Sequence, residues 1–163
     1  YNPVSFVSQY INQDRQKDHG LEWEAVYQFS KGIALKAFYN YVTGTFHTRN
    51  AGKDTSYNNL LRRPQSAGGI NLSAAIHPRL YISSNLAITG ERKDAYFDNN
   101  SFSTVYTTLG AYALWDIYAE YRFCKNRLKF FADIRNITGS RYTEISGFST
   151  PGTNGFGGIR YSF

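Results

Sequence analysis

Apolar and polar residues alternate with a period of two along most of the chain, which is the pattern of β-strands that have one apolar face. Every odd position of segment 109–123 holds an apolar or aromatic residue, whereas every charged residue of that segment stands at an even position. The same alternation predicts about eight strands. They lie at roughly 3–12, 18–29, 32–46, 63–76, 79–97, 109–123, 127–144 and 154–163.

The predicted strands are longer than the five or six residues usual in globular proteins, and a tilted strand needs about 9–11 residues to cross a bilayer. Tight turns alternate with longer loops. The turns lie at 30–31, 77–78 and 124–126, and the loops at 47–61, 98–108 and 145–153. Hairpins would then place all turns at one end and all loops at the other, as in outer-membrane barrels. We therefore expect an all-β, antiparallel transmembrane β-barrel rather than a soluble sandwich.

Composition and charge exclude several classes of protein. The 163 residues suit one domain, and 14 Tyr and 12 Phe exclude a disordered chain. The single cysteine excludes a disulfide framework. The net charge is +6, but Lys and Arg are not gathered into one run, so no nucleic-acid partner is expected. No signal peptide precedes the strands, so we expect the chain to begin partway through a larger protein.

The last strand has the form of a barrel-insertion signal. It ends in an aromatic residue, and apolar or aromatic side chains share one of its faces. The residues concerned are Gly158, Ile159, Tyr161 and Phe163. Such an edge must be recognised before the barrel closes, so the barrel-assembly machinery is an expected partner.

Four stretches, in this order and spacing, resemble the C-terminal part of TonB-dependent outer-membrane receptors. They are HGLEWE at 19–24, LRRP at 61–64, DIRNITGSRY at 133–142 and YSF at 161–163. The resemblance covers nearly the whole chain and is nearest to the cobalamin receptors. It implies that residues 1–163 are the C-terminal segment of a twenty-two-stranded barrel, without its plug domain and N-terminal strands.

The resemblance also implies a function. The full receptor would import a scarce nutrient, cobalamin or an iron siderophore, across the outer membrane of a Gram-negative bacterium. This segment would supply barrel wall, extracellular loops and the closing strand. The implied partners are outer-membrane lipid and lipopolysaccharide, a surface lipoprotein, and TonB and the plug in the full-length receptor. The alternative is a small autonomous eight-stranded outer-membrane barrel with a structural or adhesive role.

Three groups of residues are candidates for binding or for stabilising the barrel. Amide and phenol groups in the predicted extracellular loops can hydrogen-bond and stack on a ligand: Tyr57, Asn58, Asn59, Asn99, Asn100 and Tyr106. Cations at the outer rim can bind lipopolysaccharide phosphate, or Glu91 and Asp94 balance them locally: Arg62, Arg63, Arg92 and Lys93. Charges facing the lumen are expected to pair with one another, Asp116 with Arg135 and Asp133 with Arg160, or to contact the plug of an intact receptor: Asp116, Arg122, Asp133, Arg135 and Arg160.

Catalysis, metals and cofactors find little support. Glu22 and Glu24 share a face, but nothing else indicates hydrolysis. A lipase-like nucleophile motif fails because Pro151 replaces the second glycine of G-x-S-x-G. The three histidines are far apart in the sequence. We expect no catalytic residues, no metal site and no cofactor.

Overall fold

The computed structural model describes residues 15–30, 32–50, 53–58, 60–124 and 127–163, and its structure is antiparallel β throughout. The predicted strand at 3–12 lies outside the described residues. Among the described residues, no helix is long and apolar enough to cross a membrane. The strands are β1 (Arg15–Ser30), β2 (Ile33–Asn50), β3 (Lys53–Asn58), β4 (Ser66–His77), β5 (Leu80–Thr89), β6 (Arg92–Asp98), β7 (Ser103–Leu109), β8 (Tyr112–Phe123), β9 (Leu128–Arg135) and β10 (Asn154–Tyr161).

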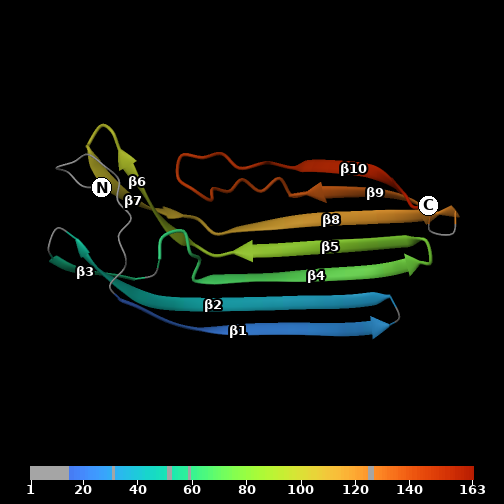
Figure 1. Cartoon of the computed structure of the whole chain (residues 1–163), viewed down its shortest axis with the longest axis horizontal. Coiled ribbons are helices and arrows are strands. Elements are labelled where there is room, and N and C mark those ends of the chain that lie inside the picture. Colours follow the sequence, from blue (N-terminus) through green and yellow to red (C-terminus); the bar gives the residue numbers. More distant parts are fainter. Residues whose placement is uncertain (1–14, 31, 51–52, 59, 125–126) are drawn as a thin grey trace.

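Eight strands form one meandering sheet. Its order is β1-β2-β4-β5-β8-β9-β10, and β3 pairs with the last residues of β2. β6 and β7 form a separate two-stranded sheet. The C-terminal ends of β1, β4 and β8 lie at one end of the sheet, and β3, the β6–β7 hairpin and the loop after β9 lie at the other (Figure 1). The predicted fold class and the predicted separation of turns from loops are confirmed.

The described sheet is open. β1 and β10 are its two edge strands, and they do not pair with each other. The described strands therefore do not form the closed eight-stranded barrel that is the alternative reading of the sequence.

The sheet is one layer thick, so almost no apolar side chain is buried within it. Leu109 is the only buried hydrophobic side chain among the described residues. Trp115 is 43% exposed and Phe130 is 41% exposed. A soluble sandwich would bury such residues between two sheets, whereas a barrel wall presents them to hydrocarbon. We call the face that carries Trp23, Trp115 and Phe130 the outward face, and the opposite, charged face the inner face.

One predicted strand, 79–97, is divided in the structure. β5 ends at Thr89, and the chain turns into β6 after Gly90. The Gly90 N–H donates a hydrogen bond to the Ser66 carbonyl at 2.8 Å, and a Cβ on Gly90 would lie 2.7 Å from that oxygen. This close approach requires glycine and lets β6 leave the sheet. Much of the predicted loop 98–108 is accordingly strand β7, and much of loop 47–61 belongs to β2 and β3.

The predicted strand 127–144 ends early, at Arg135. Asn136 has a φ of 50° and Gly139 a φ of 66°, so the backbone leaves the extended conformation at these positions. The connection from β9 to β10 is consequently a long loop, 136–153, rather than the shorter loop 145–153 that the alternation predicts.

Candidate functional site

A hollow of about 640 Å³ lies on the inner face, beside the 136–153 loop. Short turns mark the periplasmic end and long loops the extracellular end of outer-membrane barrels, so we call the end that carries β3, the β6–β7 hairpin and this loop the outer end. The hollow is therefore near the outer end. It is lined by Ser83, Asn85, Leu114, Asp116, Tyr118, Asp133, Arg135, Asn136, Tyr142, Pro151 and Asn154.

Asn136 anchors the loop that borders this hollow. Its backbone N–H donates to Asp116 Oδ1 on β8 at 2.8 Å. Its side chain bridges the backbone of Ser140, donating to the carbonyl and accepting from the N–H, each at 2.9 Å. Thr153 donates to the Asn136 carbonyl at 2.7 Å. Because Asn136 is buried and these hydrogen bonds join both ends of the loop, the loop is held against the sheet.

Acidic, basic and aromatic side chains all line or border the hollow. Arg135 Nη2 lies 3.4 Å from Asp133 Oδ2, and its guanidinium lies 5.2 Å from the centre of the Phe156 ring. Burial and the nearby Glu144 carboxylate raise the pKa of the Tyr142 phenol, so this group remains a neutral hydrogen-bond donor at neutral pH. The lining can therefore bind a polar ligand through hydrogen bonds and ring contacts.

Asp94 joins three segments at the outer end. Its Oδ1 accepts hydrogen bonds from Arg62 Nε at 2.7 Å and from the Ala95 N–H at 2.8 Å, and its Oδ2 accepts from the Ser146 N–H at 2.7 Å. Asp94 is fully buried. Burial raises its pKa, but the hydrogen bonds from Ser146, Arg62 and Ala95 outweigh burial and leave the pKa below its ordinary value. The carboxylate is therefore charged at neutral pH, and it connects the β3–β4 segment, β6 and the 136–153 loop.

Arg92 strengthens the same connection. This residue is buried, and its Nη2 donates to the Thr143 carbonyl at 2.7 Å. Its guanidinium lies 4.9 Å from the centre of the Tyr112 ring, which in turn is 4.5 Å from the Tyr142 ring. The Tyr112 hydroxyl donates to Glu144 at 3.1 Å. The 136–153 loop is thus fixed to β6 and β8 by both polar and ring contacts.

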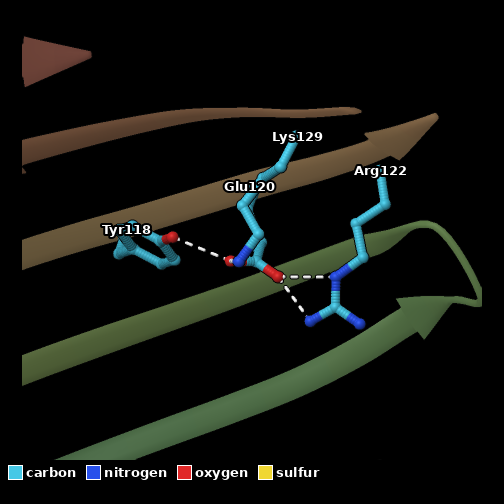
Figure 2. A network of polar contacts seen from close by, with 4 residues as sticks. All are labelled: Tyr118, Glu120, Arg122 and Lys129. Carbon is cyan, nitrogen blue, oxygen red and sulfur yellow. Dashed lines mark hydrogen bonds and ion pairs between the residues drawn. The ribbon is translucent and has the colours of Figure 1, made fainter. Parts of the chain in front are cut away.

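Glu120 is the centre of a second polar cluster, on the inner face towards the tight turns (Figure 2). Its Oε2 accepts from Tyr118 at 2.8 Å and from Lys129 Nζ at 2.7 Å. Its Oε1 accepts from Arg122 Nε at 2.8 Å. One buried carboxylate therefore holds two cations and a phenol together across β8 and β9.

The predicted ligand-binding residues fall at the outer end. Tyr57 and Asn58 belong to β3, where they pair with Phe46 and Thr45, and Asn59 lies outside the described residues. Asn99 and Asn100 are exposed at the tip of the β6–β7 hairpin. Tyr106 on β7 is 59% exposed. Asn99, Asn100 and Tyr106 do not line the 640 Å³ hollow, and ligand contact by any of the six residues stays a prediction.

Each of the four predicted lipopolysaccharide-contact residues contacts a different group of the protein. Arg62 binds Asp94, and Arg92 is buried beneath the 136–153 loop. Arg63 pairs with Asp18 at 2.7 Å. Lys93 donates to Thr108 at 2.8 Å and lies 3.6 Å from Glu91. Their guanidinium and ammonium groups thus already have protein partners, and lipopolysaccharide contact by them remains untested.

The predicted inner-face charges are placed by strand register. β8 and β9 pair so that Asp133 is opposite Tyr118 and Arg122 is opposite Lys129, and their paired register ends at Ile117 and Ile134. Asp116 accepts the Asn136 N–H, and Arg135 pairs with Asp133. Arg160 is opposite Lys129 on β10, whereas Asp133 is opposite Phe156. The expected Asp133–Arg160 pair is therefore wrong, because Arg160 lies four positions, about 13 Å, further along the strands.

The proposed insertion strand, β10, is an exposed edge. Ile159, Tyr161 and Phe163 have 67%, 55% and 108% relative exposure, and the Tyr161 and Phe163 rings are 5.2 Å apart. On the inner face, the Phe131 ring covers Gly158, where an added Cβ would lie 2.8 Å from the ring. This geometry fits an edge available for pairing, and recognition by the assembly machinery stays a prediction.

The described residues contain no group of three or more His, Cys, Asp or Glu that could hold a metal ion. Glu22 and Glu24 lie on the inner face of β1 and border a hollow of about 470 Å³ with Phe38 and Asn40. Sequence reasoning named Asp94 only as a local counter-charge for the outer-rim cations, and it missed Glu120 and Asn136 as organising residues. A charged residue in the middle of an aromatic strand is the signal that would have pointed to Glu120.

The open, single-layered sheet with an apolar outward face and a charged inner face defines the wall of a transmembrane β-barrel. A model of the family described as TonB dependent receptor-like, beta-barrel matches residues 1–137. The chain belongs to this family, and the resemblance inferred from its motifs is confirmed. No curated protein matches the chain.

Several solved structures share the fold. The FpvAI–pyocin S2 complex has a TM-score of 0.75 and 17% identity, with 91% of this chain and 19% of that chain covered. The ferripyoverdine receptor of the outer membrane of Pseudomonas aeruginosa, bound to ferripyoverdine, has a TM-score of 0.73 and 18% identity. The match covers 91% of this chain and 20% of that chain. FpvA from P. aeruginosa PAO1 bound to pyoverdine has a TM-score of 0.70 and 18% identity, with 91% of this chain and 22% of that chain covered. The chain spans about a fifth of the length of these receptors.

Proposed function

We propose that this chain is the C-terminal wall segment of an outer-membrane receptor that imports a ferric siderophore. The single observation that carries the proposal is membership of the TonB-dependent receptor family over residues 1–137. The open sheet supports it, because unpaired strand edges are costly in hydrocarbon and further strands of a larger barrel would satisfy them. The proposed role is transport rather than catalysis.

The siderophore class is favoured over cobalamin by two observations. Structures with the same fold are ferripyoverdine receptors. The inner-face hollow also offers carboxylate, guanidinium, amide and phenol groups beside aromatic rings, which suits a chelate rich in hydrogen-bonding groups. We propose that the hollow lines the path of the ligand and that the exposed loop residues, Asn99, Asn100 and Tyr106 among them, contact it first.

The remaining parts of the machinery belong to the same proposal. The eight strands would complete a twenty-two-stranded barrel in the outer membrane of a Gram-negative bacterium, with a plug domain inside it. Coupling to TonB would act through that plug. The barrel-assembly machinery would recognise β10, and a surface lipoprotein would be an additional partner at the outer end.

Uptake assays on the full-length receptor test this function. Cells that produce it would be supplied with ⁵⁵Fe-loaded siderophores or with labelled cobalamin, in the presence and absence of TonB. We expect TonB-dependent uptake of a ferric siderophore and none of cobalamin. Receptor-independent uptake of all ferric siderophores, or TonB-dependent uptake of cobalamin alone, would contradict the proposal.

The outer-end residues are tested in the same assay. The triple variant Asn99→Ala, Asn100→Ala, Tyr106→Ala should raise the half-saturating siderophore concentration about fivefold, which corresponds to the loss of a binding contact. Thr104→Ala, an exposed position on the same hairpin, is the matched control. An unchanged half-saturating concentration in the triple variant would remove the β6–β7 hairpin from the ligand site.

A further inference from the structure

The outward face of the β1–β2 hairpin changes character sharply along its length. From Leu21 to Phe29 this face of β1 is apolar or aromatic, but beyond Leu21 it carries His19, Lys17 and Arg15. All three basic residues are exposed. The acidic residues of β1 stand at even positions and so lie on the inner face. They are Asp18, Glu22 and Glu24.

Strand register places polar partners beside these cations. Lys17 is opposite Thr45 and His19 is opposite Thr43, while Arg15 is opposite His47. β2 contains no acidic residue. Within the described part of the chain, no ion pair is formed by Arg15 or Lys17. On the β1–β2 hairpin the outward face is thus positive at this end, because the acidic residues of β1 lie on the inner face and β2 has none.

Lys17 and His19, but not Arg15, border a hollow of about 410 Å³. It is lined by Lys17, His19, Thr43, Gly44, Thr45 and Gln65. Ammonium, imidazole and hydroxyl groups therefore converge on one concave surface. These groups bind phosphate oxygens well, because a cation and nearby hydroxyl donors form charge-assisted hydrogen bonds with them.

The position of the cluster along the strand matches the lipid headgroups. His19 is two residues beyond Leu21, and Lys17 is four residues beyond it, so the cations begin about 7 Å along the strand from the apolar band. Aromatic residues Trp23, Tyr39 and Tyr41 stand on the same face between the cluster and the apolar residues nearer the turns. Such rings mark the membrane–water interface in barrels.

We propose that Arg15, Lys17 and His19, with Thr43 and Thr45, form a binding site for the phosphate groups of a lipid headgroup in the outer leaflet. A negatively charged headgroup packed against the barrel would meet cations at its own depth, while its acyl chains would contact Leu21 and Trp23. We call these five residues the outward cationic site. Adjacent stretches of β1 would thus contact the two parts of one lipid, the cations its charged headgroup and the apolar residues its acyl chains.

This assignment differs from the rim cluster that the sequence suggests. Arg62 and Arg92 are engaged with Asp94 and Thr143, and Arg63 is engaged with Asp18. Arg15 and Lys17 have no such partners in the described structure and lie on the face that meets lipid. The outward cationic site is also independent of which nutrient the receptor transports.

The test uses the full-length receptor, purified in mild detergent and incubated with bisphosphorylated lipid A or with its dephosphorylated form. Native mass spectrometry counts the lipid that each receptor retains. Arg15→Gln, Lys17→Gln is the site variant. Arg63→Gln, Lys93→Gln is the matched control at the same end. Heat-modifiable electrophoretic mobility shows that each variant is a folded barrel.

We expect the site variant to retain at least about tenfold less bisphosphorylated lipid A than the parent, and the control to retain a parental amount. Dephosphorylated lipid A should be retained poorly by all three proteins. Equal retention by the site variant and the parent, or loss only in the control variant, would overturn the proposal. Displacement of lipid A by millimolar inorganic phosphate would also overturn it, because the site would then bind a free anion rather than a lipid.

Discussion

Asp94 on β6 accepts a hydrogen bond at 2.7 Å from the backbone N–H of Ser146, which stands 52 positions further along the chain. The same carboxylate binds Arg62, which precedes β4. A single buried side chain therefore connects the segment before β4, the β6–β7 hairpin and the 136–153 loop. Because one carboxylate joins these outer-end segments to one another, we expect them to open together.

Replacing Asp94 should release this connection. Asp94→Asn removes the charge that holds Arg62 and the Ser146 N–H. Because Arg62 is itself 49% exposed, its pairing contributes less than a fully buried ion pair. We expect the local opening free energy of residues 142–146 to fall by about 1–3 kcal/mol, the cost of leaving buried donors unsatisfied. Amide hydrogen exchange on the full-length receptor measures this directly.

Asp98→Asn provides the matched control. Asp98 lies on the same strand, but it accepts hydrogen bonds from Asn100 and Ser101 at the tip of its own hairpin. Exchange at 142–146 should be unchanged in this variant. If both variants protect residues 142–146 as well as the parent does, Asp94 does not connect the loops.

The Asp94 connection should also depend on pH. The pKa of Asp94 in the folded protein is below its ordinary value, so the carboxylate stabilises the closed loops above that ordinary value and loses this effect as pH falls through the lowered pKa. Exchange at 142–146, corrected for intrinsic rates, should be constant from neutrality to about pH 5 and should rise below about pH 4. Asp94→Asn should show no such rise, and a rise of equal size in that variant would assign the titration to another group.

The alternation of residues predicts the sheet well because each long strand crosses the bilayer as a unit, with one face in lipid. Local hairpins also have predictable registers. Counting back from the tight turn at 124–126 sets Arg122 opposite Lys129, as the structure has them. A short turn leaves little freedom in how its two strands pair.

Residue alternation does not predict contacts between strands that are joined by a long loop. The 136–153 loop leaves the register of β10 open, and so the Asp133–Arg160 pair is misplaced. The alternation predicts strand up to residue 144, but the positive φ of Asn136 ends the extended backbone directly after Arg135. The partners of Asp94 come from three separate segments, and no periodicity within any one of them indicates that they meet.

Gly20 should be indispensable to the β1–β2 pair. A Cβ on Gly20 would overlap the carbonyl oxygen of Tyr41, a backbone atom that cannot move without disturbing the ladder. We expect Gly20→Ala to destabilise the barrel by about 1–3 kcal/mol, as overpacking does. Gly152→Ala, where nothing lies within 4 Å of the added atom, is the control. Thermal unfolding of the full-length receptor measures both, and equal midpoints would show that the strands adjust to the methyl group.

We expect Glu120 to contribute to the free energy of unfolding through its contacts with Arg122 and Lys129. Replacing it by Gln leaves Arg122 and Lys129 close together on the inner face without their shared carboxylate. Breaking a buried ion pair by removing one partner leaves uncompensated charge. Arg122 is 42% exposed, so solvent screens part of the cost, and we expect a loss of about 1–3 kcal/mol.

The control for Glu120→Gln is Glu24→Gln, an exposed acid on the inner face of β1 for which no ion pair is formed within the described residues. Thermal unfolding of the full-length receptor should shift for Glu120→Gln and stay at the parental midpoint for Glu24→Gln. The double variant Glu120→Gln, Lys129→Gln should recover part of the loss, because it removes one of the two repelling cations. If the double variant is no more stable than Glu120→Gln, repulsion between Arg122 and Lys129 is not the cause, and the hydrogen bond from Tyr118 to Glu120 becomes the contact to test.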